Sequence, residues 1–159
     1  MNIKIVCVGK IKEDYLKLGI GDYIKKITPY CHIEILELKD EPIPDNPNNS
    51  EITLAISKEG ERILKVIKDN EYVINLDLNK KEFDSVNFAK YLQDKLIQGG
   101  SSLTFVIGGS YGLSNEVKQR ANDAISLSKM TFLHQMTRLI LLEQIYRSFK
   151  INRNETYHK

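Results

Sequence analysis

Hydrophobic and polar residues recur with two different periods along the chain, and the two periods predict strands that alternate with helices. Alternating or continuous apolar positions predict strands over residues 2–8, 32–38, 72–78, 102–107 and 124–127. Apolar positions three and four residues apart predict helices over residues 13–27, 51–68, 85–98, 115–123 and 135–151. This alternation is typical of an α/β fold in which a mainly parallel sheet is flanked by helices.

The length and composition of the chain fit one globular unit. A chain of 159 residues is long enough for one domain with its own core and too short for two ordinary domains. Hydrophobic residues make up 42% of it and charged residues 28%, proportions that argue against global disorder. Prolines and asparagines in the stretch 39–50 predict an exposed loop. We therefore predict a single domain that spans residues 1–159.

The two cysteines and the start of the chain bear on its location. Cys7 and Cys31 form no C-x-x-C pair and have no histidine at metal-ligand spacing, so we expect buried or half-buried free thiols and no metal site. Met1 leads directly into a strand pattern, and the longest apolar runs are too short to span a bilayer. We expect a cytoplasmic protein with no membrane partner.

The last predicted helix, residues 135–151, is apolar nearly all the way round. A helix that only covers one side of a sheet needs a narrower apolar stripe. Either deep burial within the chain or contact with a partner subunit would cover the additional apolar surface of this helix. In so small a protein we favour a homodimer.

Basic residues concentrate at the C-terminal end. Residues 129–159 contain six basic and two acidic side chains, a net charge of +4, which leaves −2 for the first 128 residues. This asymmetry indicates a polyanionic partner. The side chains that could contact phosphates or stack on bases are Arg138, Tyr146, Arg147, Arg153, Tyr157, His158 and Lys159. The alternative is structural, because Glu143 and Arg147 have the spacing of a helical ion pair and a polar tail usually frays.

A glycine-rich turn follows the most apolar strand. Gly108 begins the run GGSYG, where a ligand can approach the backbone closely beyond the carboxyl end of a strand. Leu76 lies near the end of another strand and would contact a ligand only if it shares that edge. The run is neither G-x-G-x-x-G nor a P-loop, which disfavours an NAD- or ATP-binding protein, and a turn without any ligand is equally compatible with the pattern.

A second candidate ligand segment precedes the basic helix. It consists of Leu127, Ser128, Lys129, Met130, Thr131 and Phe132. Its main-chain groups could bind an adenine edge, or it could be a plain connection in which Thr131 or His134 caps the helix. No Ser-His-Asp set, carboxylate pair or metal cluster stands out, so hydrolytic and metal-dependent activities are disfavoured.

These segments also carry a resemblance to a known family. The motifs GGSYGL, SLSKMTFLHQMTRLILLEQIYRSFKI and a terminal YHK, with VGKIKEDY near the start and KEGERIL in between, resemble the small SPOUT-class methyltransferases. Those enzymes methylate N3 of a pseudouridine in 23S ribosomal RNA, and the resemblance covers the whole chain. It departs from the family pattern at Leu133, where members usually have proline, and in residues 153–156, which lack the glycine or proline often found before Tyr-His.

The resemblance implies a C-terminal trefoil knot, a homodimer, S-adenosylmethionine as methyl donor, and helix 69 of 23S ribosomal RNA in the assembled ribosome as substrate. By position, it assigns cofactor contacts to Leu76, Gly108 and the segment Leu127 to Phe132 named above. It places Tyr157 and His158 near the site of methyl transfer. We expect His158, or else His134, to accept the N3 proton, and Arg138 or Arg153 to stabilise the anionic base. The competing hypothesis is a non-catalytic RNA-binding or ribosome-associated module of the same fold.

Overall fold

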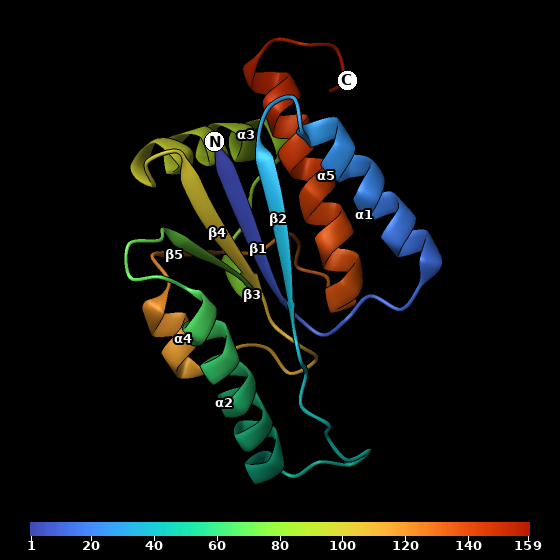
Figure 1. Cartoon of the computed structure of the whole chain (residues 1–159), viewed down its shortest axis with the longest axis vertical. Coiled ribbons are helices and arrows are strands. Elements are labelled where there is room, and N and C mark those ends of the chain that lie inside the picture. The colour runs from blue at the N-terminus through green and yellow to red at the C-terminus, as the bar shows by residue number, and fades with distance from the viewer.

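The computed structural model describes all residues from Met1 to Lys159 and consists of one parallel sheet between two layers of helices (Figure 1). The strands are β1 (Asn2–Val8), β2 (His32–Leu38), β3 (Val73–Lys81), β4 (Ser102–Ile107) and β5 (Asp123–Ile125). The helices are α1 (Asp14–Ile27), α2 (Asn49–Val66), α3 (Ser85–Gln98), α4 (Asn115–Arg120) and α5 (His134–Asn152). The sheet order is β2-β1-β4-β3-β5, and every strand pair is parallel. The predicted α/β class is confirmed.

The central strand β1 is covered on both faces, which explains why its apolar residues do not simply alternate with polar ones. Ile3, Ile5 and Cys7 point into the larger core, which α1, α3 and α5 cover. Val6 and Val8 point into a smaller core that α2 and α4 close from the other side. The registers place Leu76 of β3 and Cys7 of β1 beside Ile107 of β4, so the carboxyl ends of these strands share one edge of the sheet.

Several element boundaries differ from the predicted ones for local reasons. Helix α2 begins at Asn49 rather than at residue 51, because the Asn48 side chain caps it by accepting a hydrogen bond from the Glu51 N–H. Helix α4 ends at Arg120 rather than at residue 123, because Asp123 already pairs with Ile74 in the sheet.

The long helix α5 lies between α1 and α3 on one face of the sheet (Figure 1). It buries Leu141, Leu142, Ile145 and Phe149 completely or almost completely. Burial within the chain therefore accounts for much of the apolar surface that suggested a second subunit, and the homodimer stays a prediction. Exposed large hydrophobic residues do remain nearby, on α1 and in the segment before α5, namely Tyr15, Leu18, Met130 and Leu133.

After β5, at one edge of the sheet, the chain crosses to the face opposite α4 and enters α5 (Figure 1). This path is consistent with the implied trefoil knot. Both cysteines are buried and free, as predicted. Burial raises the pKa of the Cys7 thiol to about 12 and that of the Cys31 thiol to about 11. None of the helices is long and apolar enough to cross a membrane.

Candidate functional site

A cavity of about 710 Å³, called the main cavity below, opens at the carboxyl edge of the sheet. Three segments that are far apart in the sequence line it: the end of β3 from Leu76, the glycine-rich turn after β4, and the segment from Leu127 to the first turn of α5. They meet because β3, β4 and β5 are parallel neighbours whose chains all leave the sheet at the same edge. Open parallel sheets commonly bind ligands at this edge.

The glycine turn has a shape that only glycine permits at two positions. A Cβ atom at Gly108 would lie 2.8 Å from the carbonyl oxygen of Gly112 and 2.9 Å from Leu113. Gly112 has a φ of +88° and faces open space, and the Gly112 N–H donates to the Gly109 carbonyl at 3.2 Å. The turn thus folds tightly back on itself and exposes main-chain groups to the cavity.

The segment after β5 is tied to β3 through Ser126, whose side chain is buried. The Ser126 hydroxyl donates to the Asp77 carbonyl at 2.6 Å and accepts from the Lys80 N–H at 2.8 Å. Its own N–H donates to the carbonyl of Lys81 at 2.9 Å. These bonds also explain why β3 extends past its predicted end. They fix the start of the segment and let the residues that follow project over the cavity.

The predicted cofactor residues gather in this cavity with one exception. Leu76, Gly108, Leu127, Ser128, Met130, Thr131 and Phe132 line it, whereas Lys129 does not. Sequence reasoning missed Tyr111, Lys118 and Thr137, which also line it. Tyr111 stands within the GGSYG run, which is a signal that could have been used, but nothing in the sequence marks Lys118 or Thr137.

The start of α5 differs from the alternative in which Thr131 or His134 caps the helix. Leu133 is the N-cap, and neither Thr131 nor His134 donates or accepts a capping hydrogen bond there. Leu133 has a φ of −53°, a value that proline also adopts. The backbone therefore has the shape expected of the family proline, while the exposed leucine side chain, 66% accessible, adds apolar surface at the rim.

His134 lines the cavity and belongs to α5 rather than to the loop. Its Nε2 atom packs against Gly9, where a Cβ would approach it to 3.4 Å. Burial, and secondarily the nearby Arg138 charge, lowers the pKa of His134. At neutral pH its imidazole is therefore uncharged and retains one free acceptor nitrogen.

Arg138 does not take the surface position that substrate contact requires, and this corrects the prediction made for it. The residue is 0% accessible. Its guanidinium donates to the Val8 carbonyl at 3.2 Å, to the Gly9 carbonyl at 2.6 Å and to Glu37 Oε2 at 2.6 Å. A buried arginine with three such partners joins α5 to the carboxyl ends of β1 and β2 and is held away from any phosphate.

A second cleft of about 510 Å³ lies next to the main cavity, and the two share Leu127 and Phe132 as lining residues. Its other aromatic residues are Phe83 and Phe88, and its polar residues include Ser85, Gln144 and His158. His158, predicted near the reaction, thus faces the second cleft rather than the main cavity.

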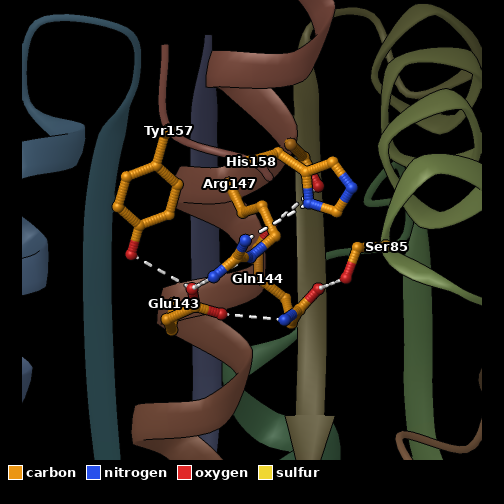
Figure 2. Close-up of polar contacts among 7 residues, drawn as sticks. Ser85, Glu143, Gln144, Arg147, Tyr157 and His158 are labelled. Carbon is orange, nitrogen blue, oxygen red and sulfur yellow. Dashed lines mark hydrogen bonds and ion pairs between the residues drawn. The ribbon is translucent and has the colours of Figure 1, made fainter.

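The C-terminal tail is packed against α5, where a frayed end was the alternative (Figure 2). The Tyr157 hydroxyl donates to Glu143 Oε1 at 3.1 Å, and its ring meets the Tyr146 ring at a centroid distance of 4.8 Å. Arg147 pairs with Glu143, as its spacing predicted, and also contacts His158 Nδ1 at 3.2 Å. Arg153 lies over the Tyr30 ring at 4.8 Å.

Comparisons with known proteins identify the family of the chain. A family model described as "Predicted SPOUT methyltransferase" matches residues 1–158. A Clostridioides difficile protein named "Ribosomal RNA large subunit methyltransferase H" is 54% identical over 159 residues, covering 100% of both chains. A protein of the same name from Latilactobacillus sakei is 51% identical over the same length and coverage. The chain belongs to the SPOUT methyltransferase family.

Proposed function

We propose that this protein transfers a methyl group from S-adenosylmethionine to ribosomal RNA of the large subunit, at N3 of a pseudouridine in helix 69 of 23S ribosomal RNA. The observation that carries the proposal is the convergence of Leu76, Gly108 and the segment from Leu127 in one cavity. Full-length relatives whose names state that they methylate large-subunit ribosomal RNA support the substrate class.

The residues of the main cavity fit S-adenosylmethionine. The volume of about 710 Å³ falls within the roughly 300–1,000 Å³ range of small-molecule sites. The tight turn at Gly108 and Gly112 lets the ligand approach main-chain groups without meeting a side chain. Leu76, Leu127 and Phe132 supply apolar walls, and Lys118 and Asp77 form an ion pair of 3.7 Å at the rim.

S-adenosylmethionine, when bound, supplies an electrophilic methyl group. The chain must hold the target base in line with that group, and N3 of the base must lose its proton as it forms the new bond. His134 in the main cavity and His158 in the second cleft are the candidate proton acceptors. The shared wall of Leu127 and Phe132 keeps the two clefts adjacent, so a base in one would lie next to a cofactor in the other.

The RNA contacts proposed here are Arg147, Arg153 and Tyr157, all near the C-terminus. Arg147 and Arg153 each lie over a tyrosine ring, so each places a positive charge beside an aromatic side chain, and that charge favours contact with the RNA backbone. We also propose a homodimer, since Leu18 and Leu133 leave apolar side chains 75% and 66% accessible on the α1–α5 side of the molecule.

Calorimetry with S-adenosylmethionine and with its demethylated product tests the cofactor assignment. We expect Gly108→Ala to weaken cofactor affinity by about tenfold or more, because its new Cβ would displace the Gly112 carbonyl. Gly21→Ala is the matched control, since a Cβ at Gly21 meets nothing within 4 Å. Binding should be absent even at millimolar ligand if the protein is a non-catalytic module.

Mass mapping of 23S ribosomal RNA tests the substrate assignment. RNA from cells that lack the gene should have lost one methyl group, and the purified protein with S-adenosylmethionine should restore it on assembled ribosomes. If no methyl group disappears on deletion of the gene, the substrate assignment is wrong, whatever the cofactor affinity.

A further inference from the structure

The His158 ring meets an arginine on its Nδ1 side. Arg147 Nη1 lies 3.2 Å from His158 Nδ1 (Figure 2). A guanidinium has five N–H donors and no acceptor, so in this contact Nδ1 must be the acceptor. The single ring proton of the neutral imidazole then resides on Nε2.

Arg147 is held in place by Glu143 rather than by His158. Glu143 Oε1 accepts from Arg147 Nη2, and it also accepts from Arg147 Nε at 3.0 Å. That hydrogen bond is the main reason why the pKa of Arg147 is raised, so its charge is permanent. The guanidinium also packs over the Tyr157 ring, 4.7 Å from its centroid, which fixes its plane.

Further hydrogen bonds orient Glu143 itself. The Tyr157 hydroxyl donates to Oε1 at 3.1 Å, and Gln144 Nε2 donates to Oε2 at 2.8 Å. Gln144 in turn accepts from the Ser85 hydroxyl at 2.8 Å. Figure 2 shows this chain of contacts running from α3 through α5 to the tail. Each member has a partner on at least one side, so the arginine reaches His158 from a fixed position.

The cleft that His158 lines suits a flat ring with polar edges. Phe83, Phe88 and Phe132 contribute aromatic surface, and Ser85 and Gln144 contribute polar groups. Proteins bind unstacked bases by combining aromatic faces with hydrogen bonds to base edges. Uracil-type bases carry two carbonyl oxygens that accept hydrogen bonds and that gain negative charge when N3 loses its proton.

We propose that Glu143 and Arg147 are positioning residues that fix His158 as the Nε2–H tautomer, so that His158 donates a hydrogen bond to a carbonyl oxygen of the target base in the second cleft. His158 is then not the proton acceptor, because the nitrogen left free of Arg147 already carries the proton. The proposal rests on the proposed function for the identity of the base, but the tautomer is a property of the protein alone.

Nuclear magnetic resonance of the full chain labelled with ¹⁵N-histidine measures the tautomer without substrate. The long-range ¹H–¹⁵N pattern of His158, assigned by its loss in His158→Gln, should show Nδ1 unprotonated and Nε2 protonated. Arg147→Met should convert this to a mixture of tautomers. Arg62→Met, which removes an arginine paired with Glu41 at 2.7 Å on a distant helix, should leave the pattern unchanged. A protonated Nδ1 in the wild type, or an unchanged pattern in a folded Arg147→Met variant, overturns the proposal.

The methylation rates of two His158 variants distinguish a hydrogen-bond donor from a proton acceptor at this position. Gln places an N–H donor near the Nε2 position but cannot accept a proton, so His158→Gln should keep most of the single-turnover rate. His158→Ala should lose about 10- to 100-fold, the worth of one hydrogen bond to a charged group, with unchanged affinity for S-adenosylmethionine. Equal losses in His158→Gln and His158→Ala would refute the donor role. A wild type without methylation activity would refute the proposed function instead, and the tautomer would still be decided by the spectra.

Discussion

Replacing Arg138 by methionine tests whether this residue is a structural cation, as its burial indicates, rather than a contact for RNA. Methionine keeps most of the aliphatic volume of the side chain, so the change removes the guanidinium and its bonds without leaving a large cavity. The bonds lost are those to the Val8 carbonyl, the Gly9 carbonyl and Glu37.

The expected loss in the free energy of unfolding depends on how exposed the three hydrogen-bond acceptors of Arg138 are. Breaking a buried ion pair by removing one partner costs roughly 3–5 kcal/mol, because the other charge stays buried. The Glu37 side chain is 36% accessible, so water can solvate its carboxylate and part of that penalty is avoided. Val8 and Gly9 are buried, and their carbonyls lose charged donors worth about 1.5–3 kcal/mol each. A loss of about 3 kcal/mol or more in the free energy of unfolding is therefore expected.

Urea denaturation followed by circular dichroism measures this loss directly, and the melting temperature should fall by about 10 °C for a domain of this size. Lys26→Met is the matched control, because it breaks a solvent-exposed ion pair with Asp22 and should cost no more than about 1 kcal/mol. A loss below about 1 kcal/mol for Arg138→Met, with RNA affinity reduced instead, would show that Arg138 is available to substrate and that the structural role is wrong.

Two further predictions concern buried titratable groups. Cys7 and Cys31, whose thiol pKa values burial raises to about 12 and about 11, should not react with Ellman's reagent at pH 8 until the protein is unfolded, and rapid reaction in the native state would contradict their burial. Burial also raises the pKa of the Glu59 carboxyl above its ordinary value. The folded state therefore binds the carboxyl proton more tightly than the unfolded state does, and the protein loses stability as the pH rises past the ordinary pKa of a glutamate. Glu59→Gln should therefore raise the melting temperature relative to wild type more at pH 7 than at pH 4, and an equal difference at both values would refute the desolvation argument.

The sheet and the position of the main cavity could be foreseen from the sequence because they depend on local patterns and on one rule of topology. Apolar periods located β1, β2 and β4 to the residue. Once the sheet is parallel, the ends of neighbouring strands must meet at one edge, which brings Leu76, Gly108 and Leu127 together without any knowledge of individual contacts. Lys129 was included only because it stands between two lining residues.

The roles of the charged residues could not be foreseen, because they depend on partners far away in the chain. The basic pattern of the C-terminal region predicts Arg138 on the surface, yet its acceptors at the ends of β1 and β2 precede it by 101 to 130 residues. Sequence patterns predict that a charged side chain lies in solvent, unless an oppositely charged residue stands within one helical turn of it. Glu143 and Arg147 meet that condition, and their pairing was anticipated for this reason.

The contacts of the polar tail could not be foreseen for the same reason. They also show that the two ends of α5 have different roles. Glu155 is bound by Lys150 at 2.7 Å and by the Tyr30 hydroxyl at 2.6 Å, and neither contact produces a periodic pattern in the short polar tail. Near its start, α5 uses Arg138 to hold the helix against the strand ends beside the main cavity. Two to three turns later it uses Arg147 to hold the tail beside the second cleft. Arg138 and Arg147 thus orient different elements at the two clefts. Replacing Arg138 should therefore lower the stability of the fold, whereas replacing Arg147 should change the His158 tautomer.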